Sequence, residues 1–344
     1  MRQVLITGAA GFIGSYTVRE FVAQGWHVLA LLHRTRAPEL EELQRDGVVT
    51  LLYGDMTDPR ALRAAVTSAL QARGGALDAI VHCAGRASDV GWSRAFRTAN
   101  YASVVHLGTL ALELGVARFV FVSTTDVYGL RDFAGEGEDE LPLVNNTHNP
   151  YPHYKIAAEQ WVRATLPADR YALIRPAAVW GVGDKTLTPR AIAFLRTSPW
   201  MIHFGHWRGR NRWPLAHVRN VAMGNYLAAT QPEAAGKAIN ILDSEHTSID
   251  EFYHLVAEIF LPGKSFGCLT VPRWLGQIYG GIVSCCSNLC HLDHPCTDPS
   301  LYALYSISSH LDFSNQRFRD LLATAARTLV SREAGLAELR NTRH

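Results

Sequence analysis

The sequence lacks a strong excess of charge and a regular set of cysteines. Its formal net charge is only +2 over 344 residues. Because the Lys and Arg residues are also scattered, small molecules are favoured over nucleic acid as partners. The six cysteines do not follow the even spacing of a secreted disulfide framework, since Cys83 stands alone and the other five lie in the C-terminal third. We therefore expect reduced thiols.

Long apolar runs are also missing. No uninterrupted run reaches the ~18 residues that a membrane span needs. The most apolar stretch, residues 269–292, is interrupted by Pro272, Arg273, Gln277 and Asn288. The start of the chain passes directly into a strand-like run, without the apolar segment of a signal peptide. These absences predict a cytoplasmic protein with no stable membrane span, and they leave open an apolar helix at 269–292 that lies on a surface.

Short apolar runs alternate with helical segments through the first half of the chain. With 48% hydrophobic and 19% charged residues, the chain can bury a full core. The predicted strands are residues 4–6, 28–32, 49–53, 79–82, 119–122 and 171–174. Such alternation favours right-handed crossovers and a parallel sheet with helices on both faces, which is the doubly wound α/β architecture. After Pro176 the pattern becomes irregular.

A glycine motif follows the first predicted strand. Gly8, Gly11 and Gly14 have the spacing G-x-x-G-x-x-G and open a helix that runs to about Gln24. The first glycine allows a sharp turn, the second lets the backbone approach a pyrophosphate, and the third lets helix and strand pack closely. The helix N-terminus then faces the phosphate charge. This context predicts a dinucleotide site.

The residues after the second strand bear on the choice of cofactor. An Asp or Glu would stand there to bind the ribose of NAD, but the sequence is His33-Arg34-Thr35-Arg36. A guanidinium can hold a 2′-phosphate, so Arg34 points to NADP(H), with His33 and Arg36 as candidates to assist and NAD(H) as the alternative. After the third strand, Asp55 could accept from the adenine amino group or cap the helix that begins near Pro59.

Several further motifs occur in a fixed order along the chain. They are Gly54-Asp55-Met56-Thr57-Asp58, His82-Cys83-Ala84-Gly85, Asn100, residues 122–129, Tyr151-Pro152-His153-Tyr154-Lys155, Arg175-Pro176 and His217-Val218-Arg219-Asn220-Val221-Ala222. Together with the glycine motif, they resemble the extended short-chain dehydrogenase/reductase family, also called the NAD-dependent epimerase/dehydratase group. The resemblance covers residues 4 to about 240. Its Tyr-Pro-x-x-Lys and His-Val-x-Asn-Val-Ala segments are most similar to the 3β-hydroxysteroid and sterol dehydrogenase branch.

The resemblance implies a division into two parts. Residues 1–176, with a returning segment at about 214–242, would form an NADP-binding Rossmann domain, and residues 177–213 and 243–344 a substrate lobe. The residues implied to contact the cofactor are Gly8, Gly11, Phe12, Ile13, Gly14, His33, Arg34, Asp55, Met56, Cys83, Ala84, Gly85, Asn100, Ser123, Tyr151, Lys155, Pro176 and Ala178. The role of Asn100 is implied to be mainly structural, and residues 83–86 are expected to contact the cofactor through their backbone.

The catalytic hypothesis rests on three residues. Tyr151 and Lys155 lie four apart, so on a helix their side chains share a face. A neighbouring ammonium and the charge of an oxidised nicotinamide would lower the pKa of the phenol from its usual ~10, which makes it a usable acid and base. The resemblance implies that Lys155 also holds the nicotinamide ribose and that the hydroxyl of Thr124 polarises the substrate carbonyl. Tyr154 is the rival tyrosine, but at one residue before Lys155 it faces another side of the helix.

The expected reaction interconverts a ketone and a secondary alcohol. The sugar dehydratases of the family carry Asp and Glu directly after the Thr, whereas Thr125 and Asp126 stand here, so dehydration lacks its proton donor. Nucleotide-sugar epimerases usually retain NAD, which Arg34 argues against. Two alternatives stay open: an epimerase or related sugar-modifying enzyme, and a non-catalytic NADP-binding regulator, whose expected mark would be a lost Tyr or Lys.

Two C-terminal segments suggest further contacts. The basic and aromatic stretch 203–213 carries Arg208, Arg210 and Arg212, which could grip an anionic group of the substrate or be a solvated loop. The segment 285–296 has enough Cys and His for a metal but lacks paired C-x-x-C knuckles, so no metal is predicted. Because free cysteines favour buried apolar surface, a lid or interface helix is expected at 273–292.

The helical segments 100–114 and 151–164 are apolar on more than one face. Members of the family that the chain resembles often assemble through such helices. The sequence therefore predicts a homodimer.

Overall fold

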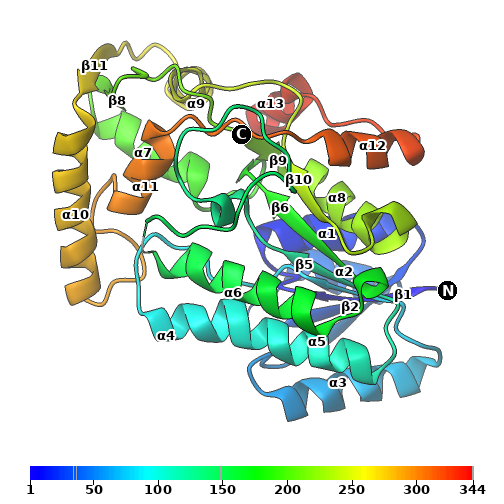
Figure 1. The fold of residues 1–344 in the computed structure, drawn as a ribbon. Coiled ribbons are helices and arrows are strands. Elements are labelled where there is room, and N and C mark those ends of the chain that lie inside the picture. Colours follow the sequence, from blue (N-terminus) through cyan, green and yellow to red (C-terminus); the bar gives the residue numbers. More distant parts are fainter. Residues whose placement is uncertain (34, 36, 148, 343–344) are drawn as a thin grey trace.

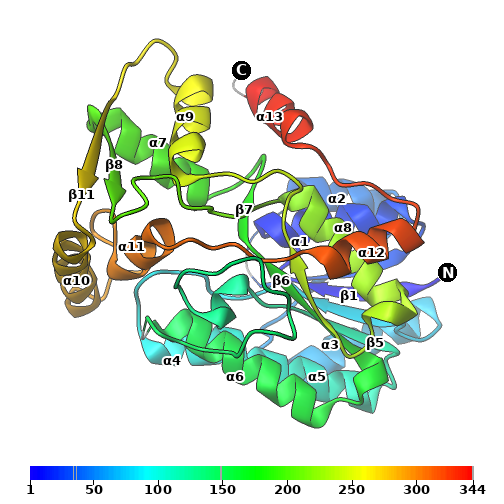
Figure 2. The same cartoon turned by 45° about the horizontal axis from the view of Figure 1, so that its top comes forward.

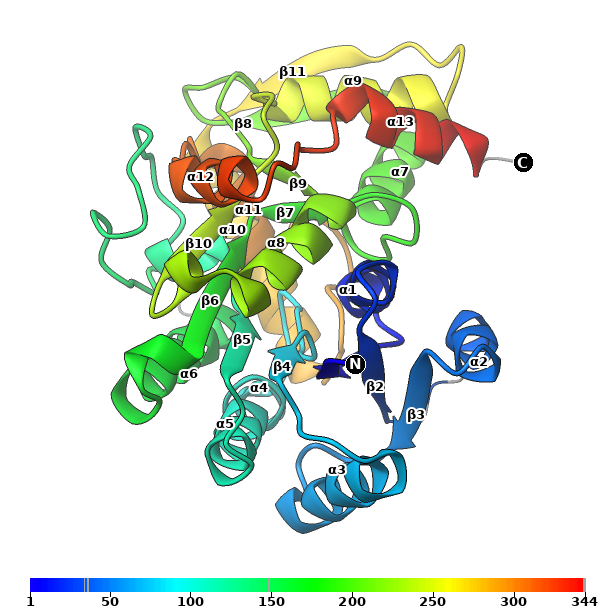
Figure 3. The ribbon, with the colours of Figure 1, turned by 90° about the vertical axis from the view of Figure 1, so that its right-hand side faces the viewer.

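A seven-stranded parallel sheet forms the centre of the molecule. The computed structural model describes residues 1–33, 35, 37–147 and 149–342. Figure 3 shows the strands side by side in the order β10-β6-β5-β4-β1-β2-β3, and every pairing is parallel. Their bounds are β1 Gln3–Thr7, β2 His27–Leu32, β3 Val49–Tyr53, β4 Ala79–His82, β5 Arg118–Val122, β6 Tyr171–Pro176 and β10 Ala238–Ile241. All six strands predicted from the sequence are present, so the doubly wound α/β architecture is confirmed.

Helices cover both faces of this sheet because successive strand residues point to opposite sides. In β1, Val4 and Ile6 belong to one core and Leu5 belongs to the other. Helices α1 Phe12–Ala23, α2 Pro38–Arg45 and α8 Val218–Thr230 pack on the first face, and helices α3 Pro59–Arg73, α5 Ser103–Glu113 and α6 Pro150–Thr165 pack on the second. Figure 1 shows α5 and α6 below the sheet and α1 and α8 above it.

The C-terminal part of the chain returns to the sheet and then leaves it. Helix α8 packs on α1, and β10 extends the sheet beside β6. Most of the other elements after β6 gather beyond the carboxyl ends of the strands (Figure 2). They are β7 Ala178–Trp180, α7 Leu187–Thr197, β8 Trp200–Phe204, β9 Leu215–His217, α9 Ile249–Phe260, β11 Gly267–Val271, α10 Arg273–Leu289 and α11 Leu301–Ser308. Figure 2 shows α7, β8, α9, β11, α10 and α11 on its left. Strands β8 and β11 pair in parallel, as do β7 and β9.

Two last helices complete the described chain. Helix α12 Gln316–Thr324 packs against β10 and α8, and α13 Arg332–Asn341 follows it. Among the described residues, no helix has both the length and the apolar character that crossing a membrane requires.

A buried ion pair holds α6 against the sheet. Arg175 on β6 donates to both carboxylate oxygens of Glu159 on α6, at 3.0 and 2.5 Å, and both side chains are almost fully buried. The same guanidinium donates to the Tyr128 hydroxyl at 2.6 Å, and that hydroxyl donates to Asn240 on β10 at 2.8 Å. Every charged group in this network therefore has a partner, as buried charges require. The network fixes the helix that carries Tyr151 and Lys155.

Candidate active site

The turn between β1 and α1 has the shape that a dinucleotide phosphate needs. Gly8 has φ +66°, and a Cβ there would lie 2.8 Å from the backbone nitrogen of Ala84. A Cβ on Gly14 would lie 2.0 Å from the carbonyl oxygen of Gly8, so only glycine allows this approach of helix and turn. The N-cap of α1 is Gly11, which has no side chain to accept from the first-turn amides. These amides are available to an anion, so the cradle fits a pyrophosphate.

The loop after β4 is fixed by Asn100. This buried amide accepts from the backbone nitrogen of Arg86 at 2.7 Å and donates to its carbonyl oxygen at 2.9 Å. A Cβ on Gly85 would lie 2.8 Å from the Asn100 amide oxygen and 3.4 Å from Lys155 Nζ. Glycine at this position therefore allows the loop, the amide and the lysine to lie together. The contacts of Asn100 fit the structural role that the resemblance implies.

The three predicted catalytic residues converge on one cavity. Asn149 starts α6 by accepting from the backbone nitrogen of Tyr151 at 2.7 Å, which places Tyr151 in the first turn and Lys155 one turn later. The Lys155 ammonium donates to the carbonyl oxygen of Val122 at 2.7 Å and lies 6.0 Å from the centre of the Tyr151 ring. Thr124 follows β5 and is buried. All three line the same cavity.

The rival tyrosine points elsewhere. The hydroxyl of Tyr154 forms a hydrogen bond of 2.9 Å with Ser93 Oγ. Its side chain lines a separate hollow between α6 and the π-helix Arg97–Ala102. The geometry therefore favours Tyr151 as the acid and base of the candidate site.

Electrostatics in the site differ from the sequence-based expectation. Burial raises the pKa of the Tyr151 phenol above its ordinary 10, the Asp126 carboxylate raises it further, and the neighbouring Thr124 offsets part of this. Burial lowers the pKa of Lys155 to about 8, although Glu159 and Cys83 favour its charged form. The expectation that the ammonium lowers the phenol's pKa is therefore not met in the chain by itself, because desolvation is larger. The phenol is protonated at neutral pH, as a proton donor must be.

Asp126 and Tyr302 complete the polar part of the site. The Tyr302 hydroxyl, on α11, donates to the Asp126 carboxylate, and both residues line the cavity. Burial raises the pKa of Asp126, and the hydrogen bond from Tyr302 lowers it in part. Sequence analysis treated Asp126 only as an argument against dehydration, and it missed Tyr302. No local spacing could have linked two residues that are 176 positions apart.

Most of the predicted cofactor residues line this cavity, which measures about 1390 Å³. They are Gly8, Gly11, Phe12, Ile13, Gly14, Met56, Cys83, Ala84, Gly85, Ser123, Tyr151, Lys155, Pro176 and Ala178. Three do not line it. Asn100 instead binds the backbone of Arg86 in the loop after β4. Near the ends of β2 and β3, the His33 Nε2 atom lies 3.8 Å from Asp55 Oδ2. Arg34 and Arg36 lie outside the described residues, so the structure does not test their role.

The helix-cap alternative for Asp55 is wrong. Asp58 caps α3 by accepting from the backbone nitrogens of Arg60 and Ala61, at 3.0 and 3.1 Å. Asp55 instead accepts from the backbone nitrogen and hydroxyl of Thr57, at 2.8 and 2.7 Å. Asp58 directly precedes Pro59, the first helical residue, so it stands at the N-cap position and Asp55 does not.

The rest of the cavity wall is mainly apolar. Its apolar members from the C-terminal elements include Phe194, Ile202, Phe204, Trp213, Phe252, Tyr253, Leu275, Ile307 and Leu311. Arg190 also lines the cavity, but it forms ion pairs with Asp89 and Asp298. Lys185 lies on the exposed part of the wall.

Of the two alternatives for the basic stretch 203–213, the cavity lining does not support the anion grip. None of Arg208, Arg210 and Arg212 lines the cavity; the first two are exposed, and Arg212 pairs with Asp312 at 2.6 Å. The stretch instead contributes Phe204 and Trp213 to the apolar wall.

The predicted helix at 273–292 is present as α10, but its cysteines do not behave as expected. Leu275, Gly276 and Tyr279 line the cavity, while Trp274, Ile278 and Ile282 are each more than half exposed. All six cysteines are free, and the five in the C-terminal third are exposed rather than buried.

Comparison with known proteins identifies relatives of this chain. The model of the NAD-dependent epimerase/dehydratase family matches residues 4–241. A 2-alkyl-3-oxoalkanoate reductase from Stenotrophomonas maltophilia (strain K279a) is 30% identical over 268 residues, which cover 76% of this chain and 76% of that protein. A 3 beta-hydroxysteroid dehydrogenase/Delta 5→4-isomerase from Mycobacterium tuberculosis (strain CDC 1551 / Oshkosh) is 30% identical over 273 residues, 74% of this chain and 69% of that protein.

The solved structures agree on the fold. A UDP-glucuronic acid 4-epimerase from Bacillus cereus, in complex with UDP-glucuronic acid and NAD, superimposes with a TM-score of 0.70 at 18% identity, covering 99% of both chains. A dTDP-glucose 4,6-dehydratase from Bacillus anthracis (strain Ames), in complex with NAD, gives a TM-score of 0.71 at 18% identity, covering 99% of this chain and 96% of that one.

Proposed function

This chain belongs to the NAD-dependent epimerase/dehydratase family, whose members here include NAD(P)-dependent reductases and dehydrogenases, and we propose that it interconverts an apolar ketone and its secondary alcohol. The observation that carries the proposal is the convergence of Thr124, Tyr151 and Lys155 beside the glycine turn, in one cavity with an apolar outer wall. A nicotinamide cofactor, when bound, would supply or accept the hydride. The chain's own residues bind and orient the substrate, and they move the proton.

In the direction of reduction, Tyr151 donates its phenolic proton to the carbonyl oxygen of the substrate. Its raised pKa keeps that proton in place until charge develops on the oxygen. Thr124 lies beside it and donates a hydrogen bond to the same oxygen. The Lys155 ammonium, 6.0 Å from the Tyr151 ring centre, stabilises the phenolate that forms and would hold the ribose of a bound cofactor.

The cavity wall supports an apolar substrate. Aromatic and aliphatic side chains from α7, β8, α9, α10 and α11 surround the part of the cavity beyond Tyr151, and the guanidinium of Arg190 there is already neutralised by Asp89 and Asp298. A substrate with a large apolar body gains the most from such a wall. The two reductase and dehydrogenase relatives are named for alkyl-oxoalkanoate and steroid substrates, so this chain is proposed to act on a ketone of one of these chemistries. If the substrate carries a carboxylate, Lys185 is the candidate partner for that group.

Two finer proposals rest on the sequence. A preference for NADP(H) over NAD(H) is proposed because no acid follows β2 and Arg34 stands there. A homodimer through the helical segments 100–114 and 151–164 is proposed because both are apolar on more than one face, and the partly buried Tyr101, Tyr154 and Trp161 line a hollow between them. Light scattering at micromolar concentration tests the dimer, and a clean monomer there would refute it.

A substrate panel tests the function. NADPH oxidation should be measured with a 2-alkyl-3-oxoalkanoate, a 3-ketosteroid and a dTDP-4-keto sugar. The proposal expects turnover with one of the first two. Turnover of the sugar alone would favour the sugar-modifying alternative. Quenching of tryptophan fluorescence by NADPH without any turnover would favour the regulatory alternative.

A further inference from the structure

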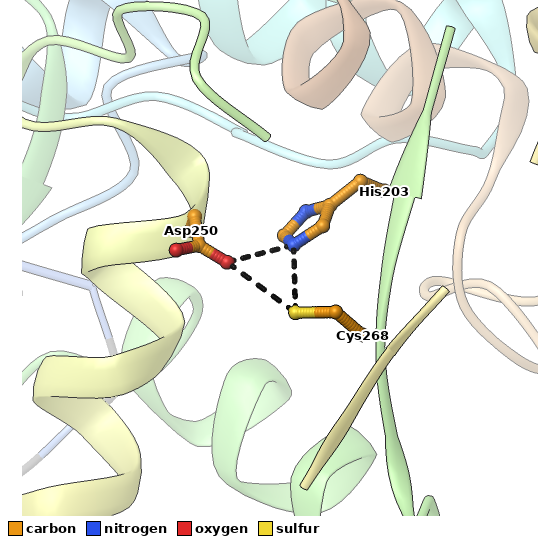
Figure 4. Close-up of side chains that lie close together, drawn as sticks. All are labelled: His203, Asp250 and Cys268. Carbon is orange, nitrogen blue, oxygen red and sulfur yellow. Dashed lines mark hydrogen bonds and ion pairs between the residues drawn. The ribbon is translucent and has the colours of Figure 1, made fainter. Parts of the chain in front are cut away.

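A second cluster of reactive side chains lies outside the active-site cavity. His203 on β8, Asp250 on α9 and Cys268 on β11 point toward one another (Figure 4). The His203 Nε2 atom lies 2.8 Å from Asp250 Oδ1 and 4.0 Å from Cys268 Sγ, and Sγ lies 3.9 Å from the same carboxylate oxygen. The imidazole is almost fully buried, the carboxylate is half-buried and the thiol is exposed.

We propose that this cluster binds a divalent transition metal and that Zn²⁺ is the ion it fits. Imidazole nitrogen, thiolate sulfur and carboxylate oxygen are all zinc ligands, whereas the sulfur and nitrogen argue against Mg²⁺ or Ca²⁺. Zinc bond lengths of ~2.0–2.3 Å in a tetrahedron put its ligand atoms ~3.4–3.6 Å apart. The three observed separations lie on both sides of this value, so small side-chain rotations suffice. The thiol proton leaves to solvent when the metal binds.

The geometry distinguishes a metal site from a Cys-His-Asp catalytic relay. In a relay, the carboxylate contacts one imidazole nitrogen and the nucleophile contacts the other. Here the carboxylate and the sulfur both approach the same nitrogen, Nε2, as Figure 4 shows. Three potential ligand atoms that converge on one point suit a shared cation better than a proton transfer.

The imidazole is held by packing, and among the described residues its Nδ1 atom has no hydrogen-bond partner. A Cβ on Gly209 would lie 2.5 Å from His203 Nδ1, so this glycine, at φ +82°, packs directly against the ring. The Tyr253 ring stacks on the imidazole, with 6.1 Å between ring centres. His254 lies one turn after Asp250 on α9, its Nε2 3.7 Å from Asp250 Oδ2, and is the candidate fourth ligand, with water as the alternative.

The position of the site suggests what the metal would do. Side chains alternate along β8, so Ile202 and Phe204 line the cavity while His203 points to the other side of the strand. Tyr253, which stacks on His203, also lines the cavity. A metal bound here joins β8, α9 and β11 behind the apolar wall and stabilises that wall without taking part in hydride transfer.

Cobalt binding tests the site directly, because a thiolate ligand gives Co²⁺ a charge-transfer absorption. The reduced full-length chain should be titrated with Co²⁺ and then with Zn²⁺, and Zn²⁺ affinity should be measured by competition with a chromophoric chelator. We expect about one ion per chain, with a thiolate-to-cobalt band that Zn²⁺ abolishes. The Cys268→Ser variant should lose the band and bind Zn²⁺ more than about 10-fold more weakly, since loss of even an outer-shell partner costs 10–100-fold.

The matched control is Cys290→Ser, another exposed cysteine, which lies in the Cys- and His-containing segment 285–296. It should keep both the band and the affinity, and Asp250→Asn should weaken binding. If Cys290→Ser loses the band and Cys268→Ser keeps it, the metal sits in the C-terminal segment and the proposal is wrong. The proposal is equally overturned if the unaltered chain gives no thiolate band. Because the readout uses the metal alone, neither outcome depends on the proposed ketone reduction.

Discussion

The candidate active site and the proposed metal site differ in how their residues are distributed along the sequence. Tyr151 and Lys155 lie one turn apart on α6, and Thr124 follows β5 of the central sheet. His203, Asp250 and Cys268 come from three separate elements and are separated by 47 and 18 residues. The first cluster has a recognisable spacing because one helix presents both side chains. The second exists only once β8, α9 and β11 are packed, so no sequence motif reports it.

The two clusters also differ in how deeply their side chains are buried. Lys155 and Thr124 are almost fully buried, and desolvation shifts the pKa values of Tyr151 and Lys155 in opposite directions. Cys268 is exposed, although burial and the Asp250 carboxylate raise the pKa of its thiol. We infer that proton transfer is placed where water is excluded, and that the proposed metal site is placed where an ion can enter.

The largest expected effect comes from removing the transferable proton. Tyr151→Phe keeps the ring but not the hydroxyl, so kcat for ketone reduction should fall by about 10²–10⁴-fold while NADPH affinity stays nearly unchanged. Lys155→Ala should weaken NADPH binding as well. Steady-state kinetics and fluorescence titration separate the two phenotypes. The matched control is Tyr154→Phe: if it loses activity and Tyr151→Phe does not, the wrong tyrosine has been assigned.

The next largest effect is expected on the free energy of unfolding, when the buried ion pair that holds α6 is broken. Glu159→Gln leaves the Arg175 guanidinium buried with a neutral partner, and breaking a buried pair typically costs about 3–5 kcal/mol of unfolding free energy. Urea unfolding measures this loss. The exposed pair of Arg63 and Glu113 provides the comparison, because Glu113→Gln should cost at most about 1 kcal/mol. Equal losses for the two variants would contradict the role given to the buried network.

The cofactor preference should respond to Arg34. If this guanidinium forms a charge-assisted hydrogen bond with the 2′-phosphate, Arg34→Ala should weaken NADPH binding by about 1.5–3 kcal/mol and leave NADH almost unaffected. The measurement is kcat/KM for both cofactors in both proteins. A preference of the unaltered chain for NADH, or equal values, would refute the NADP(H) proposal.

A smaller effect is expected from pH. Burial lowers the pKa of Lys155 to about 8, so the ammonium loses its proton as the pH rises through that value. NADPH affinity should therefore be constant below about pH 7 and fall above about pH 8, by at most about tenfold per pH unit because one proton is lost. Lys155→Arg keeps its charge throughout this range and should flatten the profile. A flat profile in the unaltered chain would show that the ammonium charge does not contribute to binding.

How much the sequence could predict follows from the range of the interactions. The six strands and the glycine turn are set by local apolar patterns, and the paired spacing of Tyr151 and Lys155 by helix geometry, so all were predictable. Tyr302 was not, because its contact with Asp126 depends on where α11 packs. The anion-grip hypothesis for Arg212 failed for the same reason, since its partner Asp312 lies 100 residues away. The cap of α3 was left open as an alternative role for Asp55, although a helix that begins at Pro59 has Asp58, the residue directly before it, at its N-cap position.

Transfer of a labelled hydride tests the central claim most directly. NADPH carrying deuterium at C4 of the nicotinamide, in separate samples for each face, should be incubated with the chain and whichever ketone of the panel it turns over. The account predicts that one of the two samples yields alcohol with deuterium on the former carbonyl carbon, together with one equivalent of NADP⁺, and that Tyr151→Phe slows this transfer. Product that forms without deuterium from either sample, or without net oxidation of the cofactor, would contradict it.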